Sequence, residues 1–187
     1  SLSINDAQAV ELVSAELHFA AADHITVEAA AGTHLHTSLR ELQKLGVDAV
    51  NAAGSTLDID LGWEINGNGS LSGMPNLGGD GVDVTLHGNY WNLPAFLMNA
   101  GPDSSSLKDL GVDHIRYAYD TSSGNYMSLS DYLGSLGADY STGQFNPGTA
   151  LDVISKSGVD IEMDGRYYDY NINSYVEQAE VSINMPV

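Results

Sequence analysis

A short hydrophobic pattern recurs along the chain and marks places where a helix ends and a strand begins. Its clearest copy is Leu-Gln-Lys-Leu-Gly-Val-Asp at 42–48, where two leucines at helical spacing precede a glycine and an aliphatic residue. Further copies lie at 107–115, 133–139 and 154–161. Each copy predicts the last turn of a short helix, a stop at a left-handed glycine, and entry into a strand.

Signals at the ends of these helices favour the same interpretation. Ser38 and Glu41 have the spacing of a capping box, so Thr37 or Ser38 is expected to cap the first helix. The same spacing precedes the other copies, at Ser106 and Asp109, Ser128 and Asp131, and Thr149 and Asp152. All three lysines lie in predicted last turns, where a cation suits the negative end of a helix. The aspartates after the glycines are expected to begin strands. The copies are irregularly spaced, so we do not expect a perfect solenoid.

Other stretches predict further elements. Val10, Val13 and Leu17 have helical spacing after a capping-box-like start at Ser3 and Asp6, so 3–17 is expected to be an amphipathic helix. Alternating patterns predict strands at 24–28, 57–65, 82–86, 115–119, 159–163 and 175–185. Another helix is expected from Asn92 to Met98, and 66–81 reads as a loop rich in Gly, Asn and Ser.

The predicted strand at 57–65 shapes the expected fold. Its apolar residues, including Trp63, alternate with Asp58, Asp60 and Glu64, so one face of the sheet is expected to be wet. We therefore predict an α/β (or α+β) fold with short helices packed on one face of a mixed or curved sheet. The 187 residues are expected to form a single repeat-containing domain, with a soft division near 66–80.

Composition narrows the functions that this scaffold can serve. The chain has 25 acidic against 6 basic residues, a net charge of −19, which disfavours nucleic acid and anionic lipid as partners. No apolar run approaches the ~18 residues of a membrane span, so membrane insertion is not expected. Cysteine is absent, and no nucleophile elbow, P-loop or dinucleotide fingerprint is present. We therefore expect a non-enzymatic protein.

Two clusters of acidic residues are candidate calcium ligands. Residues 78–86, with Gly78, Asp80 and Asp83, resemble the calcium-binding nonapeptide of RTX proteins at every position except Thr85. The alternative for this stretch is a glycine-rich turn into the following strand. Asp58, Asp60 and Glu64 share one strand face and form the second candidate, with a solvated face as the alternative. His34 and His36, together with His18 and His24, would suit zinc or copper, or else simply lie as polar residues in a loop before a helix.

Aromatic residues offer a different kind of site. Nine of the ten tyrosines lie at or after Tyr117. Tyr167, Tyr168 and Tyr170, together with Trp91, have the apolar face and polar tip that bind sugar rings or protein surfaces. The alternative is that these tyrosines are ordinary sheet residues.

The Gly-Val-Asp copies, the acidic cysteine-free composition and the nonapeptide together resemble modules of large type I-secreted, RTX-type bacterial surface and adhesin proteins. This resemblance implies an extracellular or cell-surface location, calcium as a stabiliser, and contacts with itself, other surface proteins or glycan. The expected function is an extracellular structural or adhesive module, with self-assembly as a further expectation. The alternatives are a module that binds glycan or another small ligand through its C-terminal tyrosines, and a secreted hydrolase with a carboxylate pair.

Overall fold

The fold is α/β, as predicted, and most of its strands run parallel. The computed structural model describes residues 1–63, 73–99, 105–118, 133–139, 141–142, 144–145, 147–163, 166–169, 171, 174–177 and 181–183. Its strands form two main sheets and two short ladders. All neighbouring strands of the main sheets are parallel except the last pair, β10 and β13.

The strands and helices are as follows. Sheet A contains β1 (Leu2–Asn5), β2 (Ile25–Ala29), β3 (Ala49–Ala52) and β5 (Asn76–Gly78), in that spatial order. Sheet B has the order β4 (Thr56–Asp60), β6 (Asp83–Asn89), β7 (His114–Ala118), β10 (Asp160–Met163) and β13 (Val181–Ile183). The ladders pair β8 (Ala138–Asp139) with β9 (Gln144–Phe145), and β11 (Arg166–Asp169) with β12 (Ser174–Glu177). The helices are α1 (Asp6–Ser14), α2 (Leu39–Leu45), α3 (Leu93–Asn99), α4 (Ser105–Asp109) and α6 (Ala150–Ser157).

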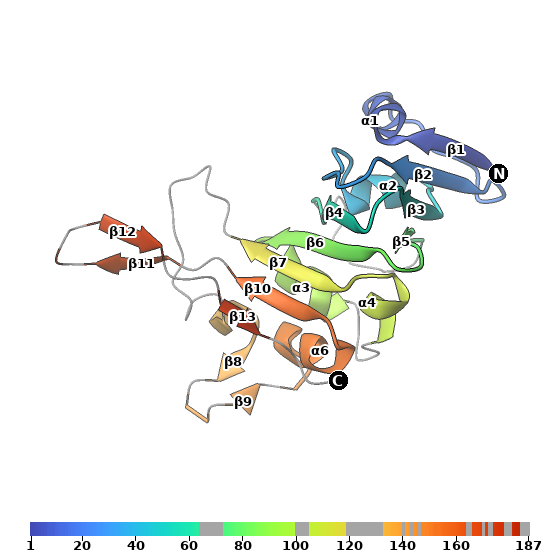
Figure 1. Ribbon diagram of the computed structural model, residues 1–187. Helices are drawn as coiled ribbons and strands as arrows, with labels where there is room; N and C mark the ends of the chain where they lie inside the picture. Colours follow the sequence, from blue (N-terminus) through green and yellow to red (C-terminus); the bar gives the residue numbers. More distant parts are fainter. Residues whose placement is uncertain are drawn as a thin grey trace.

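Successive strands stack as coils of a short, irregular solenoid. In sheet A, Leu2 pairs with Ile25 and Val27 pairs with Val50, so each of these coils takes 23 residues. Later coils are longer, with 27 residues between β4 and β6 and 29 between β6 and β7. Two coils pass directly from sheet A to sheet B, from β3 into β4 and from β5 into β6. Each coil therefore lies against the one before it, as the order of the strands in Figure 1 shows.

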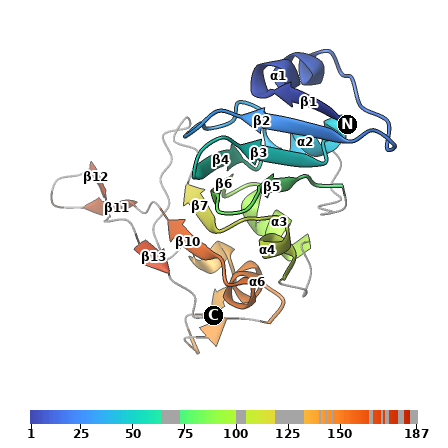
Figure 2. The same ribbon diagram turned by 45° about the vertical axis from the view of Figure 1, so that its right-hand side comes forward.

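One continuous hydrophobic core runs through the stack from Ile4 to Met163. Inward-facing strand residues such as Ile59, Leu86, Ile115 and Ile161 are fully buried there, with leucines of the helices. Helix α1 contacts α2, and α6 contacts both α3 and α4. In Figures 1 and 2, α3, α4 and α6 lie together beside sheet B, whose other face carries acidic and histidine side chains. The predicted wet face is therefore present.

Two repeat copies have the helix ends that the sequence predicts. Ser38 caps α2 in a capping box with Glu41, and Gly46 ends the helix in the left-handed conformation with φ of 85°. Thr149 accepts a hydrogen bond from the amide of Asp152 at the start of α6, which ends at left-handed Gly158. The last turns of α2, α4 and α6 contain Lys44, Lys108 and Lys156. The motif is thus confirmed as the junction between helix and strand.

The structure corrects the expectation for residues 3–17. Residues 2–5 form a strand, and the capping box that starts α1 joins Asn5 and Gln8, not Ser3 and Asp6. The buried residue of α1 is Ala9, whereas Val10 is exposed. Parallel pairing with β2 holds residues 2–5 extended, which a local helical pattern cannot show.

Other boundaries also differ from the sequence prediction. Strand β4 ends at Asp60 instead of residue 65, and β5 lies inside the predicted loop 66–81. The third repeat copy leads into the β8–β9 ladder and adds no strand to the stack. Ser106 is the second residue of α4, while Ser128 and Asp131 fall outside the described residues. The unpredicted coil at β5, which no repeat copy precedes, explains the long gap between the first two copies.

Candidate functional site

Exposed hydrophobic side chains fall into two groups among the described residues. The first group is defined by its place in the first coil and consists of Leu2, Val10 and Leu17; we call it the coil-end surface. The second consists of Trp63, Trp91 and Met98. Trp91 lies two residues before α3, and Met98 lies in the last turn of that helix. None of the described helices is long and apolar enough to cross a membrane.

The acidic face of sheet B carries histidines between its aspartates. His87 Nε2 lies 2.8 Å from Asp58 Oδ1, and His34 Nε2 lies 3.2 Å from Asp60 Oδ2. The rings of His34 and His87 are themselves neighbours, with centroids 4.8 Å apart. Asp58 and Asp60 each lie beside an imidazole ring. Their carboxylates can therefore share this face of the sheet without a bound metal ion.

A shallow depression beside β6 and β7 repeats this arrangement. His114 Nε2 lies 3.0 Å from Asp83 Oδ1, and His114 Nδ1 lies 3.9 Å from Asp160 Oδ2. Lys108 Nζ is 3.0 Å from Asp113 Oδ1 on the same lining. Such partly exposed pairs contribute little to stability one by one, about 0–1 kcal/mol each.

The predicted calcium ligands are distributed over two places. Gly78 is the last residue of β5, Asp80 lies in the turn that follows, and Asp83 begins β6. Gly78, Gly79 and Gly81 all have positive φ, so the stretch forms a tight turn between the sheets. Register with the preceding coil places Thr56 opposite Asp83, so that coil supplies no second carboxylate there.

Of the second group of predicted calcium ligands, the structure describes only two residues. Asp58 and Asp60 lie on the histidine-bearing face, and Glu64 is outside the described residues. Within the described ranges, no three His, Asp or Glu side chains are grouped to hold a metal ion. Calcium binding stays a prediction.

The aspartates of the repeat join one coil to the next. Asp48 accepts a hydrogen bond from the Ile25 amide at Oδ2 (2.7 Å), and its own amide donates to the Ile25 carbonyl (2.9 Å). Asp113 makes the same pair of bonds to Val84, at 3.1 and 3.0 Å. Asp139 instead accepts hydrogen bonds from the amide and hydroxyl of Ser141, which lower its pKa. Asp48 and Asp113 therefore each join two coils through hydrogen bonds.

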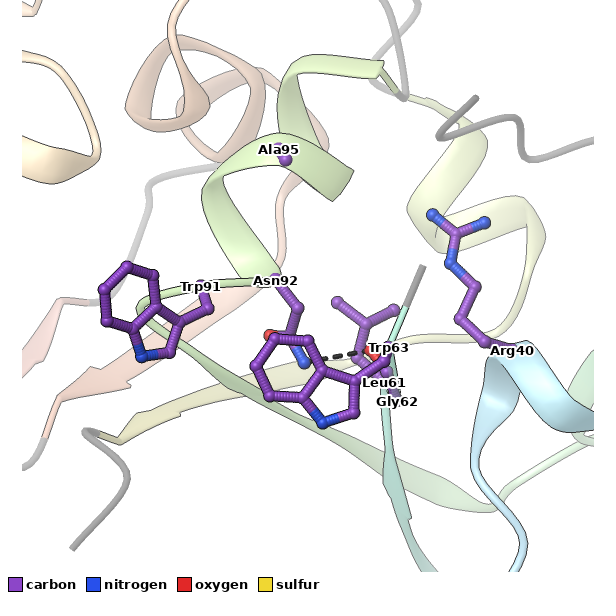
Figure 3. Close-up of a pocket in the computed structure, with 7 residues that line it drawn as sticks. All are labelled: Arg40, Leu61, Gly62, Trp63, Trp91, Asn92 and Ala95. Carbon is purple, nitrogen blue, oxygen red and sulfur yellow. Dashed lines mark hydrogen bonds between the residues drawn. The ribbon is translucent and has the colours of Figure 1, made fainter. Parts of the chain in front are cut away.

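A small cavity between the end of β4 and the start of α3 is the strongest candidate for a binding site. Its volume is about 220 Å³, and its lining comes from three coils: Arg40, Leu61, Gly62, Trp63, Trp91, Asn92 and Ala95. Figure 3 shows Trp63 and Trp91 on the two sides of Asn92, with Arg40 beyond Trp63. Trp63 is 62% exposed and Trp91 59% exposed, although both are large aromatic side chains. We call this site the tryptophan cavity.

Hydrogen bonds at Asn92 hold the two tryptophan segments together. Asn92 Nδ2 donates to the Gly62 carbonyl at 3.0 Å, and Asn92 Oδ1 accepts from the Asn89 amide at 2.7 Å. The Trp91 amide in turn donates to Asn89 Oδ1 at 2.9 Å. These bonds fix the backbone on both sides of the cavity (the bond to Gly62 is dashed in Figure 3).

The structure corrects the predicted position of Trp63. The alternating pattern placed its side chain on the inward face of a strand to residue 65, beside Leu61. Gly62, however, has a φ of 79° and packs against Ser38 and Arg40, so the strand pattern breaks one residue before Trp63. Trp63 is therefore exposed. The glycine was the signal in the sequence that could have shown it.

Of the predicted aromatic candidates, the structure places one in the cavity. Trp91 lines it, as an exposed binding residue would. Tyr167 and Tyr168 lie in β11, but their side chains fall outside the described part of the chain, as does all of Tyr170. The tyrosine half of the prediction therefore stays a prediction.

Comparison with known proteins adds no relative from which a role could be transferred. No protein-family model matches the chain, and no characterised protein or solved structure matches it. The features of the molecule that bear on its function are therefore the coils, the coil-end surface and the tryptophan cavity.

Proposed function

We propose that the chain is a non-enzymatic structural and adhesive module of the bacterial cell surface, and that copies associate through the coil-end surface. The carrying observation is the position of β1. It is the outermost strand of sheet A, and among the described residues β2 is its only partner strand. The coil-end surface lies on this same first coil, in β1, in α1 and just after α1.

The two ends of the stack differ in how they stop. At the far end of sheet B, β13 runs antiparallel to β10 and follows it at the edge. At the near end, β1 and α1 form the outermost layer in both Figure 1 and Figure 2. An edge strand beside exposed leucine and valine favours pairing with another chain, because both backbone groups and apolar area are available.

A second copy of the chain is the occupant we propose for the coil-end surface. Closed two-fold dimers are the commonest homo-oligomers, and a two-fold axis beside β1 would place two β1 strands antiparallel to each other. Leu2, Val10 and Leu17 would then face the first coil of the other copy. The net charge of −19 opposes this association, so it should strengthen as salt screens the repulsion.

Two further features support the surface location and the adhesive role. The acidic, cysteine-free composition and the RTX-like nonapeptide are typical of exported bacterial surface modules. Calcium as a stabiliser belongs to the same proposal, with the turn at 78–83 as its place.

Sedimentation of the purified chain in moderate salt tests the assembly. We expect a dimer in the micromolar range for the unaltered chain and a monomer for Leu17→Lys, because a buried lysine would lose its hydration. Met98→Lys is the matched control: Met98 is 58% exposed and Leu17 54%, but Met98 lies outside the coil-end surface. That variant should remain dimeric.

A monomeric unaltered chain at about 100 μM would overturn the proposed association. So would a dimer that survives Leu17→Lys and dissociates with Met98→Lys, because the contact would then lie at the second hydrophobic group. Circular dichroism of both variants checks that each keeps its fold.

A further inference from the structure

The tryptophan cavity has the geometry of a binding site for a small ring. Both tryptophans of the chain line it, and each is more than half exposed. Exposed apolar side chains that gather in one place often mark a site for a ligand or a partner. The volume of about 220 Å³ is below the range typical of drug-sized ligands, which suits one ring more than an extended molecule.

The backbone that carries the two indoles is held by hydrogen bonds that need no ligand. The Asn92 side chain donates a hydrogen bond to the carbonyl of Gly62, the residue before Trp63, and the Asn89 side chain accepts one from the amide of Trp91. Tyr90 also meets Trp91 edge-to-face, with ring centroids 5.0 Å apart. Ligand binding would therefore order few additional backbone groups, which lowers the entropic cost of binding.

Charge decides which class of ring fits. Arg40 is the charged residue among the described lining, and its guanidinium lies 5.3 Å from the centre of the Phe96 ring while donating to Gln43. This cation disfavours a cationic ligand, which exposed indoles would otherwise attract. The net charge of −19 disfavours an anionic ligand approaching from solution. A neutral ligand is left.

A neutral pyranose has the matching chemistry. One face of the ring presents C–H groups that can lie against the electron-rich face of an indole. Its hydroxyls can accept hydrogen bonds from indole Nε1–H groups, which are donors. The cavity therefore offers an apolar wall and polar edges to the same ring.

We propose that the tryptophan cavity binds a neutral sugar ring of a glycan, stacked on Trp63 and Trp91. A glycan would then be the ligand for the adhesive role proposed above, and this inference rests on that role. It uses a different surface from the coil-end association, so the two fail separately.

Tryptophan fluorescence measures this site directly, because the chain has no other tryptophan. Titration with neutral gluco-, xylo-, manno- and N-acetylchito-oligosaccharides should give a saturable change with at least one series. Trp91→Ala and Trp63→Ala should each weaken that binding about tenfold, measured by calorimetry, since each removes one stacking face. Trp91→Phe should restore part of the affinity, because it restores a ring. Both tryptophans are exposed, so these variants should keep the fold.

Leu17→Lys is the control that separates the two proposals. It should bind the sugar like the unaltered chain, whatever its oligomeric state. No saturable change with any series at millimolar sugar would overturn the inference while leaving the assembly untouched. Tighter binding of tetramethylammonium or of oligogalacturonate would overturn the neutral class, and unchanged affinity in both alanine variants would overturn the cavity as the site.

Discussion

At the scale of single residues, the glycines that end the repeat helices have unequal surroundings. Gly111 and Gly158 both have positive φ, 90° and 67°. A Cβ on Gly158 would meet nothing within 4 Å, whereas a Cβ on Gly111 would collide with the carbonyl oxygen of Leu77 in the preceding coil. Identical motif positions therefore differ in how closely a neighbouring coil approaches.

Substituting the two glycines distinguishes the cost of a left-handed backbone from the cost of the clash with the Leu77 carbonyl. Gly158→Ala should lower the free energy of unfolding by about 1 kcal/mol, the cost of a left-handed alanine. Gly111→Ala should lower it by about 3 kcal/mol or more, because the Leu77 backbone must also shift. Urea denaturation measures both, and equal losses would contradict the close stacking of these coils.

At the scale of elements, Asp6 joins α1 to the segment before α2. It accepts hydrogen bonds from the amides of His36 and Thr37 and from the Thr37 hydroxyl, and it contacts His36 Nδ1 at 2.8 Å. Burial raises the pKa of Asp6, but these bonds together hold the pKa below its usual value of 3.8. The ionised carboxylate is thus favoured by folding.

The lowered pKa sets the pH range over which Asp6 stabilises the fold. Its contribution is complete above the unfolded value near 3.8 and is lost as pH falls through the lower folded value. Asp6→Asn should therefore lower the free energy of unfolding by about 2 kcal/mol at pH 7, and the difference should shrink below pH 4. Denaturation at several pH values tests this. A gap for Asp6→Asn that is constant with pH would contradict the assignment.

Helices and strands whose own residues carry complete signals could be predicted from the sequence. Elements that form only because neighbouring strands pair with them could not. Helices α2 and α6 carry their own cap, apolar face and glycine stop, and both were predicted correctly. Strand β5 has three residues and no alternating pattern. It is extended because the carbonyls of Asp48 and Leu110, one coil away on either side, accept its amides. Non-local pairing of this kind leaves no local trace in the sequence.

At the scale of the whole molecule, the stack assembles a site that spacing alone could not reveal. The tryptophan cavity joins Arg40, the segment at Gly62 and the start of α3, which are adjacent only because successive coils lie side by side. Coil length varies from 23 to 29 residues in the first coils, so no fixed period aligns these positions. Trp91 could be chosen from its residue type; Trp63 required the turn at Gly62.

The net charge of −19 makes the stability of the whole molecule depend on salt. With 25 acidic residues against 6 basic ones and 6 histidines, fewer than half of the acids can have a basic partner of their own. Screening relieves their repulsion, since the Debye length falls from about 30 Å at 0.01 M to about 3 Å at 1 M. It also weakens the exposed His–Asp pairs, but these are worth about 0–1 kcal/mol each. The melting temperature should therefore rise with sodium chloride.

Calcium should act beyond this screening if the turn at 78–83 binds it. At equal ionic strength, millimolar calcium is expected to raise the melting temperature above the sodium chloride value, because a bound ion stabilises the fold by mass action. Chelator should reverse the excess and Asp80→Ala should remove it, since Asp80 is exposed within that turn. Equal melting temperatures in the two salts would exclude a specific site while leaving the general repulsion intact. The same pair of titrations thus separates a surface that merely carries many carboxylates from one that uses a few of them as ligands.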